Sequence, residues 1–112
     1  NHYEILDLMK KNMAKNNKKY PLPVIIGSIY TFFNKLFIYH SIENKKDASK
    51  ILGINPYFID EYRNASRIYT MKNISKIFNY LLEADKRSKG IDFDATNVEG
   101  ILNDLVYKIH KD

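Results

Sequence analysis

The stretch at residues 51–59 has the sequence of a helix end, a tight turn and a second helix start. Gly53 can adopt the left-handed backbone conformation that ends a helix without steric cost. Asn55 can cap the next helix, and Pro56 suits its first position, where no amide donor is needed. Two structures share such a corner: a DNA-binding helix-turn-helix, and a turn in a helical bundle that binds other proteins.

The composition favours one all-helical domain. The chain has 112 residues, of which 45% are apolar, which is enough for one hydrophobic core and too little for two. Its three prolines and four glycines lie where helices could begin, bend or end. We therefore predict a single domain over residues 1–112, an all-α bundle of about five or six helices.

Residue types that support catalysis or metal binding are scarce or scattered. The chain has no cysteine, which excludes disulfides and thiolate metal sites. Its three histidines lie far apart without partners at metal-ligand spacing, and its isolated glycines form no phosphate-binding loop. No serine or threonine lies in a recognisable nucleophile motif. We expect no catalytic, cofactor-binding or metal site.

The longest apolar segment spans residues 22–42 and follows a polar connector. On a helical wheel one face carries Ile25, Ile29, Phe33, Leu36 and His40, flanked by Ile26 and Phe32. A membrane span is disfavoured because Ser28, Thr31, Asn34 and Lys35 interrupt the segment. A buried helix is the better interpretation. An earlier helix is predicted over residues 1–16, without an N-cap, which suggests a fragment of a longer chain.

Four further helices follow from capping residues and helical spacing. Asp47 is expected to cap a short helix that Gly53 ends, and Asn55 caps the next. Thr70 is expected to cap a longer helix that ends at Gly90, and Asp94 to cap the last. Their predicted inward positions are Ile59, Tyr62, Ala65 and Tyr69; then Ile74, Ile77, Phe78, Leu81, Leu82 and Asp85; then Val98, Ile101, Leu102, Leu105, Val106 and Ile109.

Asp85 falls on an apolar stripe, where a carboxylate needs partners. We expect backbone donors or a basic side chain beside it. This is a prediction about structure and not evidence for catalysis.

The second helix of the corner decides between DNA and protein as its partner. In a DNA reader its outward positions would be Tyr57, Phe58, Asp60, Glu61, Arg63 and Asn64. Asp60 and Glu61 near the front of that helix would repel phosphates. A protein-binding corner therefore ranks above a helix-turn-helix DNA-binding domain of a transcription regulator, which remains the alternative.

Three segments, in order, give the chain a family resemblance. They are Pro21-Leu22-Pro23 before a long apolar helix, the corner at residues 51–59, and Leu82-Glu83-Ala84-Asp85-Lys86-Arg87-Ser88-Lys89-Gly90 at a helix end. In this order and spacing the chain resembles the C-terminal domain of the bacterial DNA polymerase III delta subunit, a clamp-loader component.

The resemblance implies a collar domain, in which C-terminal helical domains of five subunits pack into a ring. The implied partners are the delta-prime and tau/gamma subunits, in the cytoplasm. The sliding clamp would be bound by an N-terminal part that this sequence does not contain and that resembles non-catalytic AAA+ proteins. The parent holoenzyme would be a DNA-directed DNA polymerase. This segment itself would be neither an enzyme nor cofactor-dependent, with DNA contact secondary and no membrane contact.

A collar domain needs exposed apolar side chains for its neighbours. Tyr30, Phe37 and Ile38 lie at or beyond the margin of the long helix's apolar face, and Tyr57 lies beside the corner. We predict these four as subunit-interface residues. The alternative is that all four complete the core of the monomer.

Overall fold

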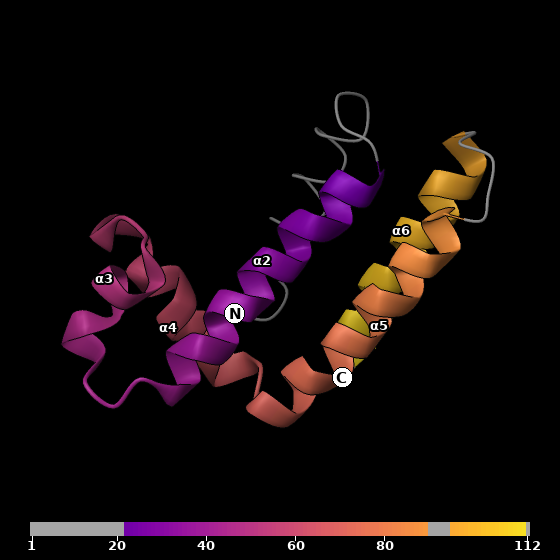
Figure 1. Ribbon diagram of the computed structural model, residues 1–112. Coiled ribbons are helices and arrows are strands. Elements are labelled where there is room, and N and C mark those ends of the chain that lie inside the picture. The colour runs from indigo at the N-terminus through magenta and orange to yellow at the C-terminus, as the bar shows by residue number, and fades with distance from the viewer. Residues whose placement is uncertain (1–21, 90–94, 112) are drawn as a thin grey trace.

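The computed structural model describes residues 22–89 and 95–111, and these residues contain helices and no strand (Figure 1). The α-helices are α2 (Leu22–Ser41), α3 (Ala48–Leu52), α4 (Ile59–Ile68), α5 (Met71–Lys89) and α6 (Ala95–Lys111), with short 3-10 turns η1 (Lys45–Asp47) and η2 (Pro56–Phe58). The predicted all-α bundle is confirmed. The helix expected over residues 1–16, the stop at Gly90 and the cap at Asp94 lie outside the described residues.

Helix α2 is the central helix of the bundle, and we call it the spine. Helix α5 packs along it and α6 packs on α5, while α3 and α4 pack against α2 on another side (Figure 1). The stacked rings of Phe32 and Tyr62, 5.2 Å apart, join α2 to α4. One apolar helix therefore holds together the α5–α6 hairpin and the α3–α4 corner.

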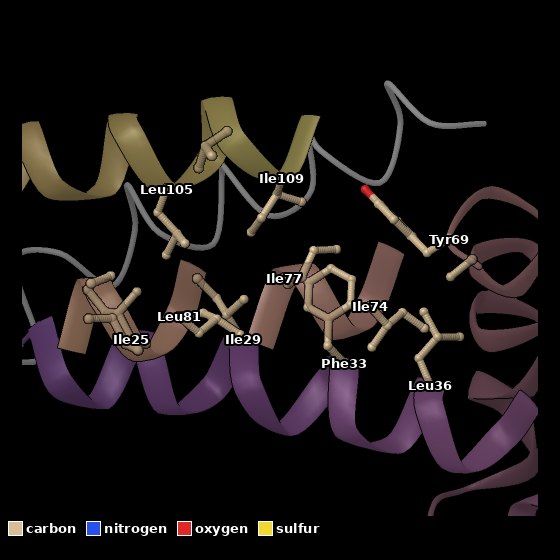
Figure 2. Packing of buried hydrophobic residues seen from close by; sticks show 14 of the residues in the cluster. Ile25, Ile29, Phe33, Leu36, Tyr69, Ile74, Ile77, Leu81, Leu105 and Ile109 are labelled. Atoms are coloured by element: carbon tan, nitrogen blue, oxygen red, sulfur yellow. The ribbon is translucent and has the colours of Figure 1, made fainter. Parts of the chain in front are cut away.

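The core forms where the inward faces of α2, α5 and α6 meet. Figure 2 shows Ile25, Ile29 and Phe33 of α2 facing the buried side chains of α5 and α6. By length and composition alone α2 could cross a membrane. Its buried side chains instead make it the core helix of this bundle; they are Leu22, Ile25, Ile26, Ile29, Phe33, Leu36 and Tyr39.

Tyr69 joins α4 to α5 from inside the core. Its backbone is extended, with φ −107° and ψ 109°, so the chain changes direction there. Its fully buried ring meets Phe33 edge-on at 5.2 Å, and its carbonyl lies 2.7 Å from His40 Nε2. Burial raises the pKa of Tyr69 to about 12. His40 is thus partly buried at the edge of the core, with its ring against this carbonyl.

The corner has the predicted turn chemistry with one correction. Gly53 is left-handed, with φ 67° and ψ 36°, and Asn55 Oδ1 accepts a hydrogen bond from the Tyr57 amide at 2.9 Å. Asp47 occupies the N-cap position of α3 as predicted, but its side chain makes no cap hydrogen bond. Asn44 caps the preceding turn instead and accepts from the Lys46 amide at 3.1 Å. A 3-10 turn moves the helical start three residues upstream.

We predict that Gly53→Ala destabilises the protein by about 1–2 kcal/mol, because an L side chain is strained in the left-handed region. Gly27→Ala is the matched control: Gly27 lies within exposed α2 surface, and an added Cβ meets nothing within 4 Å. That change should stabilise the helix by about 0.5–1 kcal/mol. Urea unfolding followed by circular dichroism measures both, and equal effects would contradict the assigned turn.

The inward face of α5 is narrower than the sequence predicted. Ile74, Ile77 and Leu81 are buried as expected, together with Ala84 and Ser88. Leu82 was predicted inward, but it is 53% exposed because its position turns past the margin facing α2. Asp85 is only partly buried and pairs with Lys89 at 3.0 Å, the basic partner that the sequence called for.

Candidate subunit interface

The helices leave several large apolar side chains in contact with solvent. Such side chains mark association surfaces when they lie together, and they are unremarkable when scattered. They fall at four places along the chain: Val24, Tyr30 and Ile38 on α2; Ile51, Tyr57 and Phe58 at the corner; Met71 and Leu82 on α5; and Tyr107 on α6. The question is therefore which of them are neighbours.

Two helices contribute to one continuous aromatic surface. The Phe78 ring of α5 lies 5.4 Å from the Tyr30 ring and 5.8 Å from the Phe37 ring, both of α2. Leu82 follows Phe78 by one helical turn and so extends the surface along α5. We call Tyr30, Phe37, Phe78 and Leu82 the aromatic seam. It lies where α2 and α5 meet, with its inner edge on the core and its outer edge in solvent.

The seam joins two of the four predicted interface residues. Tyr30 is 48% exposed, while Phe37 is partly buried and packs against the core. Ile38 is 37% exposed. It is rotated from Phe37 by about 100° about the helix axis, so it points away from the seam. Tyr57 is 83% exposed at the corner, where its ring meets Phe58 at 5.3 Å. These four residues therefore do not form one patch.

The α2 side of the seam has few charged groups that would have to lose water when a partner covers it. Helix α2 contains no acidic residue, and Lys35 is its one Lys or Arg. Two of its exposed hydroxyls are already bonded to its own backbone: Ser28 donates to the Val24 carbonyl at 3.1 Å, and Thr31 to the Gly27 carbonyl at 2.9 Å. A polar group that keeps its hydrogen bond costs little when water is removed. This surface can be covered by a partner at low desolvation cost.

The corner has the shape of a helix-turn-helix but a poor charge distribution for DNA. Asp60 and Glu61 lie in the first turn of α4, the end that would face the groove. Asp60 is paired with Arg63, which removes one of the few cations on that helix. The exposed Tyr57 and Phe58 rings add apolar area in front of these acids. The arrangement favours protein contact over DNA contact.

A cluster of charged side chains joins α6 to α5 through ion pairs. Asp104 of α6 accepts from Arg87 at 2.8 Å and lies 3.2 Å from Lys108, and Lys108 reaches Glu83 at 3.5 Å. Partial burial raises the pKa of Asp104, but the hydrogen bonds and charges of Lys108 and Arg87 outweigh it and hold the pKa below its usual value. The ionised carboxylate is therefore the form that the folded protein stabilises.

This cluster predicts weakening in acid. A carboxyl group whose pKa is lower in the folded state stabilises the fold above its unfolded pKa of 3.8, and the effect is lost as the pH falls through the folded value. We expect the stability difference between the wild type and Asp104→Asn to be constant near neutrality and to shrink below the unfolded pKa. Urea unfolding across this range measures it.

The control for this experiment is Asp60→Asn, which removes a more exposed carboxylate with one cationic partner. Exposed pairs of this kind contribute about 0–1 kcal/mol, so Asp60→Asn should lower the free energy of unfolding at neutral pH less than Asp104→Asn does. A larger loss of stability at Asp60 than at Asp104 would contradict the assignment.

Across residues 22–89 and 95–111, no group of three or more His, Asp or Glu side chains could hold a metal ion.

Comparisons with protein-family models, curated proteins and solved structures found no match to this chain.

Sequence reasoning missed two members of the aromatic seam. Phe78 and Leu82 were assigned to the inward stripe of α5, since both have the right helical spacing. Spacing places a residue on a face but does not say how much of that face the partner helix covers. The width of the apolar stripe on α5 could have identified them, because it is wider than the face that one neighbouring helix buries.

Proposed function

We propose that this chain is the subunit-assembly domain of a clamp loader, equivalent to the collar domain of the bacterial DNA polymerase III delta subunit. The observation that carries the proposal is the aromatic seam, a partly exposed apolar surface where α2 and α5 meet. The domain would supply association energy and register, and would act in the cytoplasm as part of the replication machinery. The chemistry of DNA synthesis and clamp opening would occur elsewhere in the assembly.

The positions of the resemblance segments in the fold support this proposal. The segments that carry the resemblance fall at the start of α2, at the α3–α4 corner and in the last turns of α5. A collar domain must be helical and must present an apolar flank to each neighbour. Stable interfaces of this kind bury about 1,200–2,000 Å² in total, with aromatic side chains at their centre.

The direct test is association with the collar domains of the delta-prime and tau/gamma subunits from the same source. The full chain, immobilised through a tag, should retain both at low micromolar concentration, and an unrelated helical domain should retain neither. Absence of association at high micromolar concentration would contradict the proposed function.

The second candidate is a helix-turn-helix DNA-binding domain, and the observation that favours it is the corner. Gly53 and Asn55 have the backbone and capping geometry that such a motif uses. This candidate predicts tight binding to one duplex sequence. Weak and salt-sensitive binding without sequence preference would exclude it as the main function.

A further inference from the structure

One end of the α5–α6 hairpin carries cations that pair with no acid among residues 22–89 and 95–111. Residues 62–82 contain no aspartate or glutamate, although Arg63, Arg67, Lys72 and Lys76 all lie within them. Lys111 lies in the last turn of α6. We call Lys72, Lys76 and Lys111 the basic end.

The antiparallel packing of α5 and α6 brings these lysines to the same end of the hairpin. Arg87 meets Asp104, and four residues earlier on α5 Glu83 meets Lys108, four residues later on α6. Continuing this register places Lys111 opposite Tyr80, one helical turn from Lys76. Figure 2 shows Ile109, near the end of α6, beside Ile77 in the first half of α5.

The first two acidic residues along α5 already form ion pairs. Glu83 pairs with Lys108, and Asp85 pairs with Lys89. Lys72, Lys76 and Lys111 are exposed, and within the part of the chain that the structure describes they take part in no ion pair. Their charges therefore face solvent, available to an anion.

The placement of two of these lysines is unfavourable for the helix itself. Lys72 and Lys76 are like charges at i,i+4 spacing, which destabilises a helix by a few tenths of a kcal/mol. Lys72 also lies in the first turn of α5, where the helix dipole disfavours a cation. A bound polyanion would relieve both effects.

We propose that the basic end binds the phosphate backbone of nucleic acid without reading its sequence. This rests on the proposed function, which brings the domain close to DNA. Lysine ammonium groups on flexible stems match phosphates as point charges, and they lack the planar fork that arginine uses on guanine. The site therefore supplies charge and position, not base recognition.

The experiment is a salt titration with the full chain and fluorescently labelled oligonucleotides of mixed sequence, single-stranded and duplex. Anisotropy gives the binding constant at several salt concentrations between about 50 and 200 mM. The variant Lys72→Gln with Lys76→Gln removes two charges from the basic end. The matched control, Lys46→Gln with Lys50→Gln, removes two exposed lysines of the same spacing at the corner.

For duplex DNA, each lost phosphate contact should reduce the slope of log K against log salt by about 0.9. We expect the basic-end variant to reduce it by about 2 and the corner variant to leave it unchanged. A loss confined to the corner variant would overturn the proposal and favour the helix-turn-helix candidate. Equal losses, no measurable binding by the wild type, or equally tight binding of polyglutamate would also overturn it.

The outcome is separable from that of the proposed function. The basic-end variant should associate with the delta-prime and tau/gamma collar domains as the wild type does, because the aromatic seam is intact. Loss of DNA binding with normal subunit association supports both proposals. If subunits associate but the basic end contributes nothing to DNA binding, the inference fails while the proposed function stands.

Discussion

Replacing Phe33 with alanine should cost about 3–5 kcal/mol, the largest effect on stability that we expect from one substitution of this chain. Phe33 is fully buried at the centre of α2, faces α5, and meets the Tyr69 ring edge-on at 5.2 Å. Truncation leaves a cavity where the hairpin and the corner both contact the spine. Domains of this size are stable by about 5–15 kcal/mol, so the variant should be largely or partly unfolded near its working temperature.

The control for this prediction is Phe58→Ala, which is the same truncation at a residue that is 46% exposed at the corner. Changes at exposed positions away from the core fall within about 0.5 kcal/mol. Urea unfolding of both variants, followed by circular dichroism at 222 nm, gives the comparison. Similar costs at the two positions would contradict the assignment of α2 as the spine of the core.

The largest functional effect should come from the aromatic seam. Tyr30→Ser combined with Leu82→Ser removes its two most exposed members and keeps the core of α2 and α5 intact. We expect the affinity for the delta-prime and tau/gamma collar domains to fall at least about tenfold, since truncated aromatic anchors commonly cost more than 1.4 kcal/mol of binding. Isothermal titration calorimetry with each partner measures the change.

Its matched control is Val24→Ser combined with Tyr107→Ser, which removes apolar area outside both the seam and the corner, where the side chains are 48% and 65% exposed. This pair should bind the partners as the wild type does. If it weakens binding as much as the seam variant, general surface hydrophobicity and not the seam would account for association.

Much of this fold follows from local sequence signals. The left-handed Gly53, the capping Asn55 and the capping Thr70 act within a few residues, and each has the predicted role. Helical spacing also identified the buried residues of α6. These features could be predicted because one helix or one turn contains all the atoms that determine them.

Features that depend on contacts between helices were harder to predict. Tyr39 is buried although its helical position lies away from Phe33, since Lys45 folds back over its ring at 4.5 Å and donates to its carbonyl. Leu82 is exposed because α2 covers only part of the apolar stripe of α5. The basic end arises only when α5 and α6 are antiparallel. For Leu82 and for the basic end, the deciding neighbour lies on another helix.

The candidate interface was predicted in part. Tyr30 and Phe37 were chosen as marginal positions on one helix, and the structure joins them through Phe78. A helical wheel of α2 alone does not include Phe78, because Phe78 lies on α5. Their role in binding other subunits stays a prediction, as do those of Ile38 and Tyr57.

Site-specific photocrosslinking tests the central claim most directly. A benzoyl-phenylalanine in place of Tyr30 should crosslink to the delta-prime or tau/gamma collar domain when the subunits are mixed, and the same group in place of Tyr107 should not. That result would locate the neighbouring subunit on the seam between α2 and α5. A complex that forms normally yet crosslinks from position 107 and never from position 30 would contradict the account.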